Sequence, residues 1–334
     1  MKVRVAAISA EAYYGPEEYR NAERVLKYVD EAAAIGAQII CFPEGYPGPF
    51  NGPIDFGGHL DFNPMDALRE KARQYGVYIS AGGLEANPEL SETFFVSHKL
   101  ISPEGDILAN YRRVQPSFPG TNLYMMGGRM HVVPGDEIMV VDTGLGRIGL
   151  QSGSELLTPE ISRVQMLKGA EIILCPTGGL HSFTYLRLGE TWRSIARARA
   201  AENLLFVVVA QSVFLVNGRS YDINVGCVTS PEEFLAISEG PGIMVATLNM
   251  ERLHILRTRF QEEEYLASPK DPDNFHPVKA RPGQNHHRRP ELYRPLIEPQ
   301  EDAFDYFYSH RGLEAWRDDF QRIRRLPRPG KVLR

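Results

Sequence analysis

The sequence predicts an α/β protein with a mixed sheet, on two observations. Two β-α-β units open the chain, because short apolar runs alternate with two amphipathic helical stretches. Further along, two apolar runs flank Ser102-Pro103-Glu104-Gly105, which has proline and glycine where a hairpin turn needs them. Parallel units followed by hairpins are typical of a mixed sheet covered by helices. The strands expected in this half of the chain are residues 2–9, 38–42, 77–84, 93–101 and 106–113.

Proline, glycine and asparagine mark the ends of the first two helices. The first helix begins at Pro16 and closes at Gly36, and its apolar residues recur at helical spacing. The second has Asn63 as its N-cap, Pro64 at its first position and Gly76 near its end. Each helix lies between two predicted strands, as a β-α-β crossover requires.

The second half of the chain continues the alternation of strands and helices. The segment from Tyr185 to Glu202 has apolar residues at helical spacing and is expected to form a long helix. Asn217-Gly218 predicts another hairpin, because this pair is a strong two-residue turn signal. The strands expected here are residues 137–142, 146–152, 171–175, 204–210 and 242–250.

A strand, a sharp turn and a helix follow one another between Gly144 and Gly169. The helix opens at Thr158-Pro159-Glu160, which offers a hydroxyl N-cap, a proline at the first position and a carboxylate at the positive end of the helix dipole. A strand that turns tightly into a helix presents one residue at the edge of the sheet, and here that residue is Gly153. We expect the other elements to be arranged around this turn.

The length and composition of the chain are compatible with one large domain. Its 334 residues are 43% hydrophobic, which is ample for a shared core. We expect this domain over residues 1–260 and a C-terminal extension over residues 261–334. The extension is charged and interrupted by prolines, so it lacks a core of its own and is predicted to pack on the domain or on a partner subunit.

Charge and cysteine usage bound the environment and the partners. The net charge of −5 gives no electrostatic reason to expect nucleic acid or an anionic membrane as a partner. Cys41, Cys175 and Cys227 are odd in number and lie within or beside apolar segments, so we expect buried free thiols in a reducing, cytoplasmic environment. We expect neither a signal peptide nor a membrane span, because no apolar stretch is long enough. We also expect no metal and no cofactor, since the sequence shows no metal-ligand spacing.

Several separated motifs resemble those of the nitrilase (carbon-nitrogen hydrolase) superfamily. The resemblance covers roughly residues 1–255 and rests on the order and spacing of the motifs. It implies a four-layer αββα sandwich, which in this superfamily is usually paired through helices, and hence a homodimer or a higher homo-oligomer. The motifs are Phe42-Pro43-Glu44, Tyr111-Arg112-Arg113, Pro134-Gly135-Asp136, Ile148-Gly149 with Glu155 and Pro159-Glu160, Lys168-Gly169-Ala170-Glu171, and the run from Arg197 to Asn203.

The resemblance also implies which residues occupy catalytic positions. In the superfamily a cysteine thiolate attacks an amide or nitrile carbon, a glutamate relays the proton and a lysine faces the oxyanion. The glutamate falls on Glu44, the lysine on Arg113 and the cysteine on Gly153, which has no side chain. Arginine keeps the positive charge and can grip a carboxylate or phosphate, but its pKa above about 12 removes it from proton transfer. Glu155 falls on an acidic position whose implied role is to hold the turn by hydrogen bonds.

Neighbouring residues are candidates for binding a ligand or for replacing the nucleophile. Tyr46, Gly178 and His181 lie in loops, and Ser154 lies beside the turn, so these four are the candidate substrate-binding residues. Ser152, Ser154 and Cys175 could each be considered as a substitute nucleophile. A hydroxyl needs an adjacent base, however, and we expect the side chains before and after the turn to point elsewhere.

Three functions stay open on the sequence. The first is a pocket with Glu44 and Arg113 that binds a small amide, nitrile or carboxylate compound, or performs acid/base chemistry without a covalent intermediate. The second is an active amidase or nitrilase, either with another nucleophile or as a site-altered form of a working enzyme. The third is a purely structural subunit. Under the first two functions the partner is a small molecule.

Overall fold

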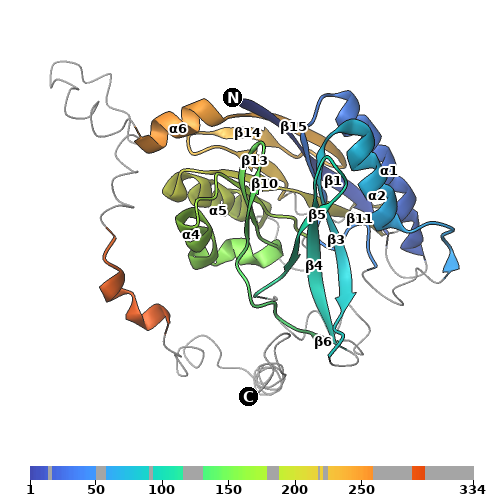
Figure 1. Ribbon diagram of the computed structural model, residues 1–334, viewed down its shortest axis with the longest axis horizontal. Coiled ribbons are helices and arrows are strands. Elements are labelled where there is room, and N and C mark those ends of the chain that lie inside the picture. The colour runs from blue at the N-terminus through green and yellow to red at the C-terminus, as the bar shows by residue number, and fades with distance from the viewer. Residues whose placement is uncertain are drawn as a thin grey trace.

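The computed structural model describes residues 1–13, 17–49, 58–89, 93–115, 131–178, 188–216, 219–220, 225–258 and 288–297. Two β-sheets lie within this part of the chain, with helices beside them (Figure 1). Both sheets contain parallel and antiparallel neighbours. The predicted α/β class with mixed sheets is therefore confirmed.

The first sheet has nine strands in the described residues, and β1 lies near its centre. The path runs β12-β11-β1-β2-β3-β4-β5, with β15 also paired to β1 and β6 to β4. The contacts of β1 with β2 and β11 are parallel, and its contact with β15 is antiparallel. The strands are β1 (Lys2–Ala12), β2 (Ile39–Cys41), β3 (Tyr78–Ala86), β4 (Thr93–Ile101), β5 (Ile107–Arg112), β6 (His131–Val132), β11 (Gln211–Val216), β12 (Arg219–Ser220) and β15 (Gly242–Asn249).

The second sheet has six strands in the described residues, in the order β14-β13-β10-β9-β8-β7. Its centre is parallel, because β9 pairs in parallel with both β8 and β10. The chain passes directly from β10 in this sheet to β11 in the first sheet across Ala210. The strands are β7 (Val140–Thr143), β8 (Gly146–Leu150), β9 (Ile172–Leu174), β10 (Phe206–Val209), β13 (Cys227–Thr229) and β14 (Phe234–Ile237).

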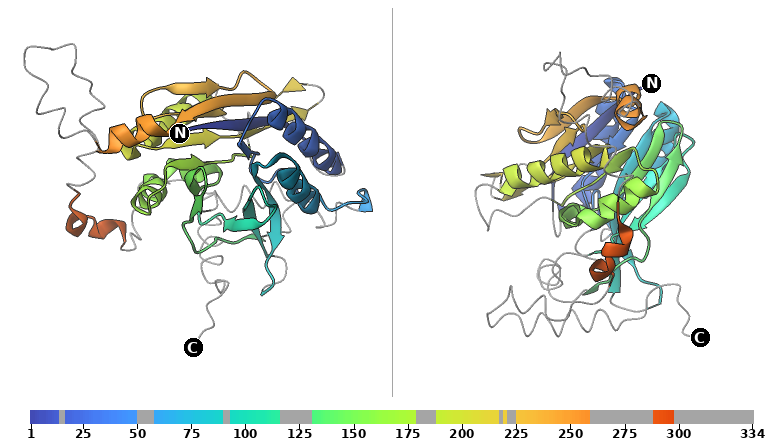
Figure 2. Two further views of the ribbon diagram at one scale, coloured as in Figure 1. Left: turned by 45° about the horizontal axis from the view of Figure 1, so that its top comes forward. Right: turned by 90° about the vertical axis from the view of Figure 1, so that its left-hand side faces the viewer.

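Three apolar clusters separate four layers of structure. One cluster lies between the sheets and joins β1 and β2 to β8 and β9. A second packs the first sheet against α1 (Tyr19–Ala34) and α2 (Pro64–Tyr75). The third packs the second sheet against α5 (Leu188–Asn203), which lies beside α4 (Pro159–Leu167). Figure 2 shows the two helix pairs on opposite sides of the sheets, so the αββα sandwich implied by the sequence is confirmed.

The ends of α2 confirm the signals in the sequence. The Asn63 side chain accepts a hydrogen bond of 2.9 Å from the backbone N–H of Met65, which caps the helix behind Pro64. Gly76 ends the helix in the left-handed conformation with φ of 64°, which glycine adopts without strain. These contacts involve neighbours in the sequence, which is why they could be predicted from it.

The turn after β8 differs from the expected passage into a helix. A short 3-10 helix, η3 (Gly153–Leu157), lies between the turn and α4. Thr158 is the N-cap residue of α4, but its hydroxyl makes no capping hydrogen bond and instead donates to Oε1 of Gln115 at 3.1 Å. The prediction that the Thr158 hydroxyl caps the helix is therefore wrong, because this hydroxyl donates its hydrogen bond to Gln115, which lies outside the helix.

The boundary expected near residue 260 stays a prediction, since residues 259–287 and 298–334 lie outside the described ranges. The last described element of the predicted domain is α6 (Met250–Thr258). Two short 3-10 turns follow at η6 (Pro290–Leu292) and η7 (Arg294–Leu296), where Leu292, Leu296 and Ile297 are exposed. Among the described helices, none combines the length and the hydropathy that a bilayer crossing needs.

Candidate functional site

The turn between β8 and η3 fixes Gly153 in an unusual backbone conformation. Its φ of +54° lies in the left-handed region, which favours glycine. The backbone N–H of Gly153 donates to the carbonyl of Pro176 at 2.7 Å, which ties the turn to the loop after β9. The turn is therefore held from outside, and its glycine occupies the position that the sequence motif assigns to a nucleophile.

Glu44 and Arg113 lie directly against this glycine. Glu44 follows β2 and Arg113 follows β5, and Nη1 of Arg113 donates to Oε1 of Glu44 at 2.8 Å. The two side chains are 10% and 4% exposed. A Cβ atom at Gly153 would lie 2.9 Å from Oε1 of Glu44 and 3.2 Å from Nη1 of Arg113. The ion pair thus covers the face of Gly153 from which a side chain would project, and the three predicted positions come together.

Ser152 and Ser154 also contact the ion pair, contrary to expectation. The hydroxyl of Ser152 donates to Oε1 of Glu44 at 2.7 Å, and Nη2 of Arg113 donates to the hydroxyl of Ser154. The expectation that these side chains point elsewhere is wrong, because Ser152 precedes the turn in an extended conformation (φ −145°, ψ 125°) that directs its hydroxyl to Glu44. Two serines therefore hold the two charges on either side of Gly153.

Glu155 joins the turn to the segment that carries Arg113. Its carboxylate accepts hydrogen bonds from the Tyr111 hydroxyl at 2.6 Å and from the backbone N–H groups of Ser152, Val114 and Gln115 at 2.7–2.9 Å. Burial raises the pKa of Glu155, while the charge of Arg113 and these donors favour the ionised form. Since Val114 and Gln115 directly follow Arg113, the carboxylate fixes the arginine relative to the turn.

The four residues expected to bind a ligand fare differently. Ser154 contacts Arg113, and Gly178 borders Glu44, since a Cβ atom at Gly178 would lie 3.2 Å from Oε2 of Glu44. Tyr46 does not come to the turn, because its buried ring packs in the cluster between the first sheet and its helices and stacks on Phe42. The apolar surface of that ring explains its place in the core. His181 lies outside the described residues.

The three cysteines are free and buried, as predicted. Cys175 lies directly behind the turn, where its thiol is 3.8 Å from the carbonyl oxygen of Gly153. Burial raises the pKa of all three thiols, that of Cys227 to about 12, so they stay protonated at neutral pH. Cys175 is fully buried and protonated, which disfavours it as a substitute nucleophile.

Arg199 of α5 contacts the backbone at the end of η3, which the sequence did not predict. Its Nε donates to the carbonyl of Leu156 at 3.1 Å, and its Nη2 donates to that of Leu157 at 3.5 Å. These carbonyls lie at the end of η3, where a helix leaves backbone acceptors without partners. Arg199 therefore supports the turn from the second helix layer. The motif from Arg197 to Asn203 was the only signal for it.

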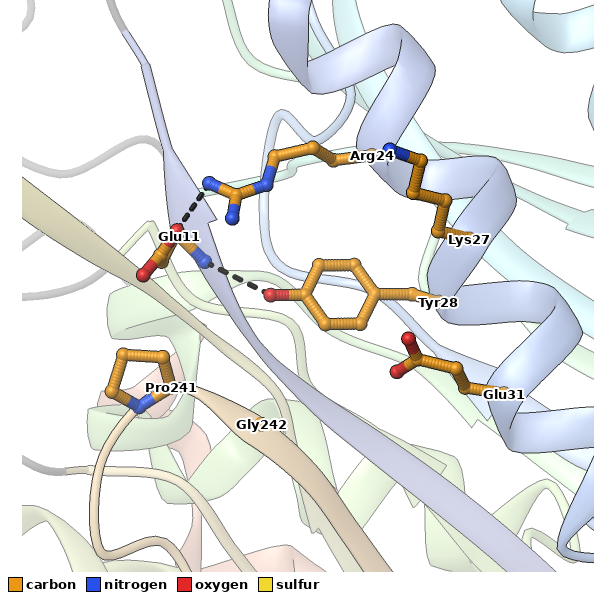
Figure 3. Close-up of a pocket in the computed structure, with 7 residues that line it drawn as sticks. All are labelled: Glu11, Arg24, Lys27, Tyr28, Glu31, Pro241 and Gly242. Carbon is orange, nitrogen blue, oxygen red and sulfur yellow. Dashed lines mark hydrogen bonds and ion pairs between the residues drawn. The ribbon is translucent and has the colours of Figure 1, made fainter.

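A pocket lies away from this turn, between α1, the end of β1 and the start of β15 (Figure 3). Its volume is about 310 Å³, and none of the predicted site residues lines it. Arg24 forms an ion pair with Glu11, whose backbone N–H donates to the Tyr28 hydroxyl at 3.4 Å. The residues that line the pocket are Glu11, Arg24, Lys27, Tyr28, Glu31, Pro241 and Gly242. Within the described ranges, no three potential metal ligands of the histidine, cysteine or acidic types come together.

Known proteins resemble this chain in sequence and in fold. Human deaminated glutathione amidase is 26% identical over 300 residues, which cover 85% of this chain and 82% of the human protein. An omega-amidase of Xenopus laevis is 24% identical over 200 residues, which cover 58% of this chain and 70% of that protein. The structure of a carbon-nitrogen hydrolase of Helicobacter pylori matches with a TM-score of 0.68 at 19% identity, covering 89% of this chain and 99% of that one. The NitFhit protein of C. elegans matches with a TM-score of 0.65 at 23% identity, covering 81% of this chain and 66% of that one.

The structural matches show a shared fold. The match to a family covers far more residues than any single motif does. Residues 4–232 match the carbon-nitrogen hydrolase family. This range includes most of β1 in the first sheet, the turn at Gly153 and most of the second sheet. The chain therefore belongs to the carbon-nitrogen hydrolase family, the nitrilase superfamily that its motifs resemble.

Proposed function

We propose that this chain binds a small amide, nitrile or carboxylate compound at Glu44, Arg113 and Gly153, without the cysteine-dependent hydrolysis typical of the superfamily. One observation carries the proposal. The Glu44–Arg113 ion pair lies against a residue with no side chain, at 2.9 and 3.2 Å from the position of a Cβ atom there. Two charged groups of opposite sign beside a bare backbone can orient a polar molecule, whereas thiolate attack needs a sulfur that Gly153 does not supply.

Amidase-type hydrolysis with another nucleophile is the second candidate. Its support is the 2.7 Å hydrogen bond from the Ser152 hydroxyl to Glu44, which is the contact of a hydroxyl with a general base. The human and amphibian relatives are named as amidases, which favours the same class of chemistry. Against it stands the burial of Ser152, which is 1% exposed. Among the described residues, Ser154 has Arg113 and no base as its partner.

Binding and hydrolysis can be separated with one panel of ligands. Propionamide, propionitrile and propionate would each be titrated while the melting temperature is followed, and ammonia release would be measured from the amide and the nitrile. We expect at least one compound to raise the melting temperature of the wild type, because a ligand that binds only the folded state stabilises it. We expect no ammonia release above that of buffer.

Two matched variants locate the effect. Glu44→Gln should abolish the shift, while Glu11→Gln, which changes the glutamate of another Arg–Glu pair, should leave it intact. Ammonia release lost in Ser152→Ala would establish the second candidate instead. No shift with any compound would contradict the proposal and favour a structural subunit.

A further inference from the structure

The two oxygens of the Glu44 carboxylate differ in their surroundings. Oε1 accepts two hydrogen bonds, from Ser152 at 2.7 Å and from Arg113 at 2.8 Å. Oε2 accepts no hydrogen bond from the residues that the structure describes. This oxygen faces the backbones of Gly153 and Gly178, since a Cβ atom at either glycine would lie 3.2 Å from it. Oε2 therefore lies against two glycine backbones, and at Gly178 it is the one atom of the described residues within 4 Å of an added Cβ.

The guanidinium of Arg113, in contrast, is engaged on every nitrogen. Nη1 donates to Glu44, Nη2 donates to the Ser154 hydroxyl, and Nε donates to the carbonyl of Gln115 at 3.1 Å. A carboxylate or phosphate ligand is gripped best by two adjacent N–H groups of a free guanidinium. Nη1 and Nη2 each carry a second N–H, so such a ligand would have to share these nitrogens with Glu44 and Ser154. The sequence suggested that Arg113 could bind an anion. In the structure the carboxylate of Glu44 already balances the charge of Arg113, which disfavours an anionic ligand.

We propose that the site at Gly153 selects ligands that donate N–H groups to Glu44 Oε2, with a cationic amidinium bound more tightly than a neutral carboxamide and a carboxylate most weakly. The inference rests on the proposed function and specifies which ligand chemistry that site takes. Ser152 and Ser154 are positioning residues, because they hold Glu44 and Arg113 in an arrangement in which no described residue donates to Oε2.

The order of affinities follows from charge and hydrogen bonding. A charged donor forms a stronger hydrogen bond to a carboxylate than a neutral donor does. A second carboxylate meets the like charge of Glu44, while the positive charge of Arg113 faces the other oxygen. A nitrile has no N–H group to donate, so Oε2 would lose its hydration without compensation.

Acetamidinium, acetamide and acetate provide a matched test, since they share one planar skeleton and differ in charge and donors. Their dissociation constants would be measured by titration calorimetry on the wild-type protein at one ionic strength. We expect acetamidinium to bind about tenfold more tightly than acetamide, which corresponds to about 1.4 kcal/mol, and acetate to bind most weakly. Acetate binding most tightly would overturn this inference while leaving the proposed function standing. Binding of none of the three would overturn both.

Variants then assign the preference to named atoms. Glu44→Gln should remove the preference for acetamidinium, whereas Glu11→Gln should leave the order unchanged. Because Glu44→Gln leaves Arg113 without its counterion, Ser154→Ala is the second test: it frees Nη2 of Arg113, so acetate should gain affinity relative to acetamide. Circular dichroism would verify that each variant is folded. An unchanged order in both folded variants, or a changed order in Glu11→Gln, would overturn the inference.

Discussion

Two arginine–glutamate pairs occupy opposite environments in this protein. Arg113 and Glu44 are 4% and 10% exposed beside Gly153, whereas Arg24 and Glu11 are 33% and 25% exposed at the α1 pocket (Figure 3). Glu44 and Arg113 are 69 residues apart in the sequence, whereas Glu11 and Arg24 lie in the consecutive elements β1 and α1. The buried pair has protein hydrogen bonds on both partners, while water can reach the other pair. The same two residue types are therefore expected to contribute differently to the free energy of unfolding in the two regions.

The two pairs differ in energetic importance because the charge that remains after a partner is removed is solvated differently in each. If one member of an exposed pair is removed, water solvates the remaining charge, and the measured contribution of such pairs is small. If one member of a buried pair is removed, the remaining charge stays in a medium that solvates it poorly.

The largest expected effect is the loss of Arg113. Arg113→Met removes the charge that balances Glu44 and should lower the free energy of unfolding by about 3–5 kcal/mol, the range for breaking a buried ion pair. Urea unfolding measures this quantity, provided that the slope with denaturant is unchanged.

A double-mutant cycle separates the pair from the rest of the side chain. Glu44→Gln combined with Arg113→Met should cost less than the two single changes added together, because the double variant leaves no buried charge unpaired. Strict additivity would mean that the two groups do not interact and would remove the basis of the contrast.

The second prediction concerns the space beside the buried pair. Gly153→Ala should lower the free energy of unfolding by about 2–4 kcal/mol, from about 1–2 kcal/mol for the left-handed backbone and a further term for the contact with Glu44. Gly76→Ala is the matched control, since Gly76 has φ of +64° but no atom within 4 Å of an added Cβ. An equal loss of unfolding free energy at both positions would mean that Glu44 and Arg113 shift away from the added methyl group at no measurable cost.

The fold was largely predictable from local signals, whereas the arrangement at the turn was not. Asn63, Pro64 and Gly76 act on their sequence neighbours, so the helix they bound could be foreseen. The meeting of Glu44 with Arg113 was expected from the resemblance to a family whose motifs supply both positions. The side chains of Ser152 and Ser154 point where they do because of the backbone angles at the turn and the 3-10 helix that follows it. No residue pattern in the sequence predicted either feature.

The α1 pocket illustrates a second limit of the sequence. Glu11 and Pro241 line it together although more than two hundred residues separate them in the chain. Only the antiparallel pairing of β1 with β15, which matches Ser9 with Gly242, brings them together. The pairing of the β15 strand could not be derived from its apolar character alone, since any strand of the sheet presents a similar pattern.

The third prediction tests burial without an ion pair. His98 of β4 is 1% exposed, and burial lowers its pKa to about 3, from about 6.5 in an unfolded chain. Between these values the unfolded state binds the proton and the folded state does not, so stability is complete above pH 6.5 and falls as the pH is lowered. The contribution is about 1.4 kcal/mol per pH unit.

Urea unfolding between pH 6.5 and pH 4 would measure this slope. His98→Gln should reduce the slope of unfolding free energy against pH by about 1.4 kcal/mol per pH unit. This holds whatever the effect of the substitution on stability at neutral pH. His254→Gln is the control, because His254 is an exposed residue that contacts Glu171 at 2.9 Å. A wild-type slope that His98→Gln leaves unchanged would contradict the prediction.

The smallest expected effect lies at the partly exposed Arg24–Glu11 pair. Arg24→Met should lower the free energy of unfolding by about 0–1 kcal/mol, because water and salt can solvate Glu11 once the guanidinium is gone. Part of any loss would reflect the hydrogen bond of 3.0 Å from Arg24 to the Tyr13 hydroxyl, and this part should persist in salt. Raising the salt concentration from 0.05 to about 1 M should shrink the remainder, since the screening length falls to about 3 Å. The cost of Arg113→Met should change much less over the same range, because buried pairs are screened little. A salt-independent loss of about 3 kcal/mol at Arg24 would show that this pair is energetically buried despite its exposure, and the contrast between the two regions would fail.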